Sequence, residues 1–168
     1  NCEAIVLEIS VNAVGHISIH DSYLHFSVSK WNQYQSIKSY MPATDLLTLA
    51  TLQHFLKAYR TVYLKPCNGQ QGRGIIKISR ENGGYELHRG RTKQRKQSIA
   101  EVMNDSQINE CYIIQQGIPL AKIQSSVFDV RVLLKKVNGH WQVKGKVVKV
   151  AGDEYIVTNA AKEVLRMN

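Results

Sequence analysis

The alternation of apolar and polar residues along this chain predicts a protein built mainly from strands. Apolar, β-branched residues predict a strand at 4–9, and alternating residues at 16–20 and 23–28 predict two more on either side of a turn at Asp21-Ser22. The Asn-Gly pairs at 82–83 and 138–139 predict hairpin turns. Further strands are expected at 75–79, 85–88, 111–118, 127–135, 141–150 and 154–159.

Hydrophobic residues at helical spacing predict two helices in the first half of the chain. The first begins at Ser29, whose hydroxyl can cap it. The segment 42–45 breaks that helix and caps the second, which is expected at 46–60. A capping box at 98–101 opens a short third helix, and a helical tail is expected from Ala160 onwards. This mixture of strands and helices predicts the α+β fold class.

The stretch 62–76 carries the main candidate chemistry. An apolar, strand-like run delivers Lys65 to Pro66, and then Gly69, Gly72 and Gly74 follow closely. Glycines let backbone N–H groups turn towards an anion, and a lysine adds a full positive charge beside them. Because no Gly-Lys-Ser/Thr closes the loop and a hairpin rather than a helix follows, the pattern is neither a Walker loop nor a Rossmann turn.

The net charge of the chain favours an anionic partner. The chain has 168 residues and a formal net charge of +9, which favours a nucleotide, nucleic acid or an acidic peptide or surface. The densest basic run, at 88–96, allows either a nucleic-acid arm or a mobile, solvated loop near an anionic ligand. The second interpretation is favoured because no aromatic residues alternate with the charges Arg89, Arg91, Lys93, Arg95 and Lys96.

The cysteines and histidines suggest no metal site. Three cysteines, an odd number without Cys-x-x-Cys spacing, are expected to be free thiols in a reducing compartment: Cys2, Cys67 and Cys111. Metal binding by His16, His20 and His25 is ranked below ordinary surface histidines. No apolar run approaches eighteen residues and no signal peptide is recognised. We therefore expect a cytoplasmic or spore-internal chain without a membrane partner, trimmed or fragmentary because it lacks an initiator methionine.

Four motifs in order carry a family resemblance. Lys65-Pro66 with the loop 69–75, then 114–118, then 128–132, resembles the ATP-grasp fold, and in particular the YheC/YheD-type proteins of endospore-forming bacteria, which are described as spore-coat-associated. Segments 30–34 and 156–159 support the resemblance, which covers roughly residues 28 to 160. We expect residues 1–28 to be the remnant of an N-terminal region and residues 29–168 to be an incomplete ATP-grasp domain.

The resemblance implies a nucleotide clasped between two α+β lobes that contain antiparallel sheets. It places Lys65 near the adenine and the α- and β-phosphates, with Lys30 on the other side of the phosphates. It gives Arg131 a catalytic role at the γ-phosphate or an acyl phosphate. The other implied nucleotide-binding residues are those of the phosphate-covering loop (Gln70, Gln71, Gly72, Arg73, Gly74), the adenine hinge (Gln115, Gln116, Gly117, Ile118), Lys149 where relatives often carry arginine, and Asn159 on the acceptor side.

The expected metal residues are missing from this pattern. ATP-grasp enzymes hold Mg²⁺ with an acidic strand residue and a Glu-x-Asn box, which we do not find, and none of Asp129, Asp153 and Glu154 matches it. Asp129 and Arg131 share one face of their predicted strand, so a structural ion pair is an alternative for both. The metal ligands are therefore left unassigned, although the resemblance implies ATP with Mg²⁺.

Three hypotheses about function remain open. The first is an ATP-binding domain of a carboxylate–amine ligase-like protein, with a small acid or amine as a further substrate. The second is a non-catalytic structural or binding module of the spore that has lost ATP-grasp chemistry. The third, ranked last, is a basic nucleic-acid-binding domain.

Overall fold

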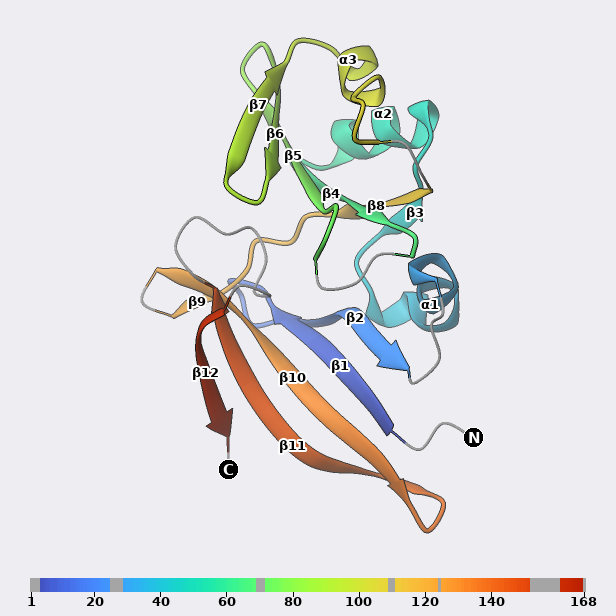
Figure 1. Cartoon of the computed structure of the whole chain (residues 1–168), viewed down its shortest axis with the longest axis vertical. Coiled ribbons are helices and arrows are strands. Elements are labelled where there is room, and N and C mark those ends of the chain that lie inside the picture. Colours follow the sequence, from blue (N-terminus) through green and yellow to red (C-terminus); the bar gives the residue numbers. More distant parts are fainter. Residues whose placement is uncertain are drawn as a thin grey trace. The chain divides into compact units, whose positions relative to one another are not determined.

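The structure is a computed structural model that describes residues 4–24, 29–68, 72–108, 111–123, 125–151 and 161–167. Helices and antiparallel sheets make up the chain (Figure 1), so the predicted α+β class is confirmed. Two compact units divide it. The first contains residues 1–28, 39–41 and 119–168, and the second contains residues 29–38 and 42–118.

The first unit is built on one antiparallel sheet with strand order β12-β11-β10-β1-β2, and β9 pairs with β10. The long β10–β11 hairpin turns at Asn138 and Gly139, both with positive φ, as the Asn-Gly pair predicted. The strands are β1 (Ala4–Val11), β2 (Ile17–Leu24), β9 (Lys122–Ile123), β10 (Ser126–Val137), β11 (His140–Ala151) and β12 (Ala161–Met167).

Two predictions in this unit are wrong. Asp21 and Ser22 form no turn but lie inside β2, where they pair with Glu8 and Leu7 of β1. The predicted helical tail is instead strand β12, which pairs with β11 over its length. In both places an adjacent strand offers backbone hydrogen bonds, and this long-range pairing overrides a local turn or helix preference.

The second unit is built on an antiparallel sheet with strand order β3-β8-β4-β5-β6-β7. The predicted β5–β6 hairpin is confirmed, and Gly83 takes the positive φ that its turn requires. The strands are β3 (Thr44–Leu46), β4 (Thr61–Pro66), β5 (Ile76–Glu81), β6 (Gly84–Arg89), β7 (Thr92–Lys96) and β8 (Tyr112–Gln116).

The basic run was wrongly predicted as a mobile loop, because its second half is the edge strand β7. Lys93 Nζ lies 3.2 Å from Glu86 Oε1, and Arg95 donates to the Asn82 carbonyl at 2.7 Å. Arg89 and Lys96 both contact the buried carboxylate of Asp105, at 2.9 and 3.3 Å. Intramolecular partners and the ladder to β6 therefore order this segment.

Helices α1 (Lys30–Ile37), α2 (Leu49–Ala58) and α3 (Ile99–Met103) and the short 3₁₀ helix Lys38–Tyr40 complete the chain. Ser29 caps α1 as predicted, accepting from the Asn32 N–H at 3.2 Å. The predicted start of α2 is wrong, because a capping box of Thr48 and Thr51 begins the helix at Leu49 and the preceding Thr44–Leu46 pairs with β8 as a strand.

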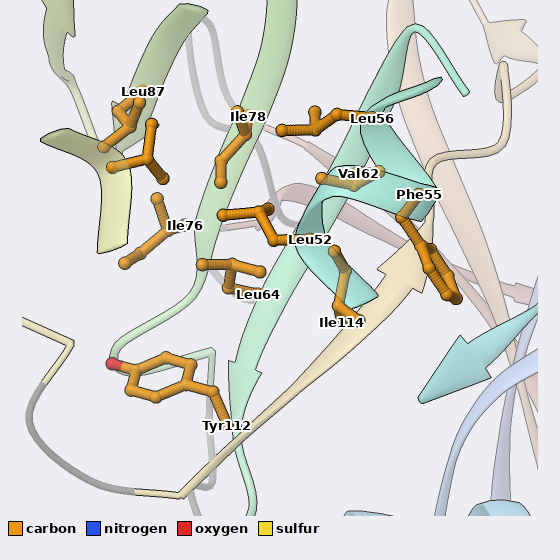
Figure 2. Close-up of a cluster of buried hydrophobic side chains, with 11 residues drawn as sticks. Leu52, Phe55, Leu56, Val62, Leu64, Ile76, Ile78, Leu87, Tyr112 and Ile114 are labelled. Atoms are coloured by element: carbon orange, nitrogen blue, oxygen red, sulfur yellow. The ribbon is translucent and has the colours of Figure 1, made fainter. Parts of the chain in front are cut away.

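The core of the second unit lies between its sheet and helices α2 and α3. Leu52, Phe55 and Leu56 of α2 reach the apolar side chains of the neighbouring strands (Figure 2). Full burial of such side chains stabilises a fold by about 1.5–3 kcal/mol each. The strand residues of this cluster include Val62, Leu64, Ile76, Ile78, Leu87, Tyr112 and Ile114.

The prediction of free thiols is wrong for two cysteines, since a disulfide joins Cys67 and Cys111. Cys67 directly follows β4 and Cys111 directly precedes β8. The antiparallel pairing of Pro66 with Tyr112 brings them together, and the Cys67 N–H donates to the Cys111 carbonyl at 2.7 Å. The inference of a reducing compartment, which rested on free thiols, falls with it. Cys2 lies outside the described residues.

Candidate functional site

Strand β4 presents two different faces. Val62 and Leu64 point into the core beneath α2, so Tyr63 and Lys65 occupy the opposite face of the sheet. Residues paired across an antiparallel sheet share a face, and the register therefore extends this face to neighbouring strands. We call it the polar face, and its members include Thr44, Gln115, Tyr63, Lys65, Lys77, His88 and Glu86, together with the apolar Ile113.

A buried hydrogen-bonded chain lies at the centre of the polar face. Lys65 Nζ donates to Gln115 Oε1 at 2.8 Å, and Gln115 Nε2 donates to Thr44 Oγ1 at 2.9 Å. The Thr44 hydroxyl in turn donates to the Pro42 carbonyl at 2.9 Å. Only 8% of Lys65 and 3% of Gln115 is exposed, so the lysine nitrogen is held inside the protein at a fixed position.

Burial and neighbouring charges shift two pKa values on the polar face. Burial lowers the pKa of His88, and the cations Lys93 and Lys77 lower it further, so the imidazole is neutral at pH 7. Burial also raises the pKa of the Tyr63 phenol, which therefore stays protonated. The cations Lys77 and Lys93 beside His88 favour an anion in this part of the face.

The glycine-rich turn follows β4 and needs its glycines. Gly72 and Gly74 both have positive φ, near 73° and 72°. A Cβ on Gly74 would lie 2.7 Å from Pro66 Cγ and 3.3 Å from the Tyr112 hydroxyl, so no other residue fits there. Arg73, between them, is exposed, whereas Gln70 and Gln71 lie outside the described residues.

Lys30 is tied by its backbone to the same region. Its N–H, at the start of α1, donates to the Cys67 carbonyl at 2.8 Å. The first residue of α1 and the residue that follows β4 are therefore neighbours. Lys30 and Cys67 are far apart in the sequence, so the sequence alone does not indicate this contact.

The predicted adenine hinge continues from β8. The Gln116 N–H donates to the Ala43 carbonyl and the Gly117 N–H to the Thr61 carbonyl, at 2.8 and 2.9 Å. A Cβ on Gly117 would lie 2.7 Å from the Thr61 oxygen, so the chain passes too close for a side chain. Because these two N–H groups already donate within the unit, a base at the hinge must use other groups of the segment that ends at Ile118.

Arg131 and Lys149 belong to the first unit. Arg131 Nη2 lies 3.4 Å from Asp129 Oδ2 on the same strand, and the Asp129 side chain is almost fully buried. Lys149 of β11 is opposite Asp129 in the ladder, and Glu8 is opposite Arg131. The ion-pair alternative for Asp129 and Arg131 is thus present in the structure. Asn159 lies outside the described residues.

The described residues do not fit a protein-held magnesium site. They contain no group of three or more His, Cys, Asp or Glu side chains that could hold a metal ion. Asp129, a buried carboxylate near Arg131, is already its ion-pair partner. We therefore assign no metal ligand in this part of the chain and derive no step through Mg²⁺.

Sequence reasoning missed several residues of this region. It placed Thr44 in a helix cap, whereas Thr44 lies on β3 and contacts Gln115, 71 residues away. No local signal marks such a pairing. Tyr63 and Lys77 could have been found, because residues that alternate with a buried strand face, or pair with it across a predicted hairpin, must share the face of Lys65.

The chain is similar in sequence to two known proteins. The chain is 28% identical to endospore coat-associated protein YheD of Bacillus subtilis (strain 168) over 148 residues, 78% of this chain and 32% of that protein. It is 27% identical to YheC of the same organism over 125 residues, 70% of this chain and 34% of that protein. The chain thus spans about a third of the length of these curated relatives.

No solved structure gives a significant match. Among the described residues, no helix is long and apolar enough to cross a membrane. A family model for YheC/D-like ATP-grasp proteins matches residues 27–167, which is most of the chain. These α+β units with antiparallel sheets therefore have the ATP-grasp fold, and the chain belongs to the YheC/D-like ATP-grasp family.

Proposed function

We propose that this chain binds ATP, with its phosphates at Lys65 and the glycine-rich turn. The observation that carries the proposal is the buried side-chain nitrogen of Lys65, fixed by Gln115 on a sheet face that also carries Lys77, directly before that turn. A fixed charge in a partly desolvated place attracts a polyphosphate more strongly than a mobile surface lysine does. The nearby backbone of Lys30 brings a second lysine of the predicted set to this region.

The remaining predicted residues have supporting roles in this proposal. The turn with Gly72, Arg73 and Gly74 covers the phosphates, and the hinge that ends at Ile118 contacts the base. Arg131, Lys149 and Asn159 would then act on the γ-phosphate and acceptor side. Gln70 and Gln71 belong to the same phosphate-covering turn.

Calorimetric titration with ATP tests the proposal. Lys65→Ala removes a charge-assisted contact and should weaken binding by about 1.5–3 kcal/mol. Lys57→Ala is a matched control, because Lys57 is an exposed lysine of α2, the helix that packs on the opposite face of the sheet. The control should bind ATP like the wild type. Equal ATP affinity of wild type and Lys65→Ala would refute the proposed site.

In a longer protein, such a domain would activate a carboxylate. The carboxylate oxygen would attack the γ-phosphorus of ATP, forming an acyl phosphate and releasing ADP, and an amine would then displace phosphate to give an amide. Arg131 is the proposed catalytic residue, because its guanidinium can stabilise charge on the transferred group. The small acid and amine are the proposed partners of this activity.

A non-catalytic spore module is the second candidate. It is favoured by the missing cluster of metal ligands among the described residues and by relatives that are endospore coat-associated proteins. The two candidates differ in one measurement. Magnesium-dependent release of ADP in the presence of amino-acid acceptors supports the ligase, whereas ATP binding without turnover supports the module.

A further inference from the structure

The side chains of Thr44, Gln115 and Lys65, here called the lysine network, have a function beyond packing. We propose that Gln115 and Thr44 are positioning residues that aim the Lys65 ammonium at the phosphates of the nucleotide. Gln115 therefore acts through Lys65 and does not read the base with its side chain. The inference rests on the proposed ATP binding and assigns Thr44, which no motif of the sequence indicated.

The direction of every hydrogen bond in the lysine network is fixed by chemistry. The Thr44 hydroxyl has one proton, which it donates to the Pro42 carbonyl at 2.9 Å. Towards Gln115 it can then only accept, so the amide nitrogen must face it, as it does at 2.9 Å. The amide oxygen consequently faces Lys65, whose ammonium can only donate, at 2.8 Å. Thr44 and Lys65 thus favour the same orientation of the Gln115 amide.

Burial makes the loss of any hydrogen bond in this arrangement costly. Gln115 is 3% exposed and Thr44 is 6% exposed, so water cannot easily replace a lost partner. Without the Thr44 hydroxyl, the buried NH₂ group of Gln115 would lose this acceptor, and the amide that holds Lys65 would be less firmly fixed. The ladder between β3 and β8 pairs Thr44 with Gln115 and keeps the two side chains in reach.

The neutral side chain of Gln115 also affects the electrostatics around Lys65. An acceptor is needed to hold Lys65 in place, but a carboxylate at position 115 would form a buried ion pair and cancel the positive charge. Glutamine supplies the acceptor without a negative charge. The hydrogen bond from Lys65 to Gln115 therefore orients the lysine without placing a negative charge beside it.

Three variants of the full chain test the lysine network. Thr44→Val keeps the shape but removes the hydroxyl, Thr44→Ser keeps the hydroxyl, and Gln115→Glu adds a negative charge. Binding of ATP, tripolyphosphate and adenosine is measured by calorimetry or competition, with a thermal melt of each variant. We expect Thr44→Val to weaken ATP and tripolyphosphate about fivefold and Gln115→Glu to weaken them about tenfold or more. Thr44→Ser should stay within about twofold of wild type, and adenosine should be affected little by any change.

The outcomes separate the two proposals. Losses confined to the phosphate-bearing ligands and rescued by serine support the lysine network. Equal losses for adenosine and ATP would mean that Thr44 and Gln115 only support the fold, and wild-type ATP affinity in both Thr44→Val and Gln115→Glu would also overturn the inference while leaving ATP binding intact. If Thr44→Val fails to fold, Gln115→Glu alone decides. A wild-type chain that binds neither ATP nor tripolyphosphate overturns the proposed function, and the network with it.

Discussion

At the scale of single residues, Gly117 is the position where the hinge tolerates no side chain. Its Cβ would lie 2.7 Å from the Thr61 carbonyl oxygen, which is backbone of β4 and cannot turn aside. We expect Gly117→Ala to destabilise the protein by about 1–3 kcal/mol through this overlap. Gly145→Ala, on β11 with nothing within 4 Å of its Cβ, is the matched control and should cost little. Denaturant unfolding measures both, and similar midpoints would contradict the prediction.

Asp105 makes the stability of the second unit depend on pH. Burial raises the pKa of its carboxyl, but the Gln107 N–H, Arg89 and Lys96 lower it more, and the pKa ends below its usual range. A depressed carboxyl pKa stabilises the fold above the unfolded-state pKa, near 4, and this contribution is lost as pH falls through the folded-state value.

We therefore expect stability to fall steeply on acidification below about pH 4. Asp105→Asn should remove part of this dependence and cost about 3 kcal/mol at pH 7, because it leaves two half-buried cations without their anion. Glu81→Gln is the control, since its pair with Arg60 is exposed. Unfolding free energies between pH 3 and 7 measure the effect. An unchanged pH profile in Asp105→Asn would count against this role.

At the scale of elements, the Cys67–Cys111 bridge joins the ends of the two strands that carry Lys65 and Gln115. It closes a segment of 44 residues, for which loop entropy gives a stabilisation of about 4 kcal/mol. We expect reductant, or Cys67→Ser with Cys111→Ser, to lower the melting temperature clearly. Cys2→Ser is the control.

A thiol count provides an independent check on the bridge. The chain has three cysteines, so the denatured, unreduced protein should react as one thiol and the reduced protein as three. Three reactive thiols before reduction, or a melting temperature that ignores reductant, would show that the bridge is absent or does not stabilise the unit.

Elements with strong local signals were predictable from sequence. Helix α1 begins at the Ser29 cap, and the β5–β6 and β10–β11 hairpins turn at their Asn-Gly pairs, because each signal acts within a few residues. The elements predicted wrongly depend on pairing within a sheet rather than on local signals. Strand β3 pairs with β8, and β12 pairs with β11, so neither could be recognised without knowing the sheet order.

The candidate site likewise has one part that the sequence predicts and one part that it does not. Lys65 and the glycine-rich turn form one continuous segment whose residue types already indicate an anion site. The contacts that fix Lys65 cannot be predicted from the sequence, since Gln115 and Thr44 come from strands that are adjacent only in the folded sheet. Thr44 in particular had a reasonable local explanation as a helix cap, and only the pairing with β8 overrules it.

At the scale of the whole molecule, the net charge of +9 raises the question of nucleic acid. Much of the densest basic run has partners within the chain. Lys93 pairs with Glu86, Arg95 donates to the Asn82 carbonyl, and Arg89 and Lys96 share Asp105. Charges held in this way still add to the field of the protein, but they are poorly placed to follow a phosphate backbone.

We therefore expect ATP and duplex DNA to differ in their response to salt. In the proposed site, the buried Lys65 would make a local contact with ATP, whereas DNA must be held by many exposed charges and releases counterions, so its affinity falls steeply as salt rises. At physiological ionic strength, excess duplex should not displace a fluorescent ATP analogue, and unlabelled ATP should displace it fully. Tripolyphosphate is the positive control for a phosphate competitor. Displacement by duplex as efficient as by ATP would instead place a nucleic-acid surface over the nucleotide site and make the third hypothesis the better one.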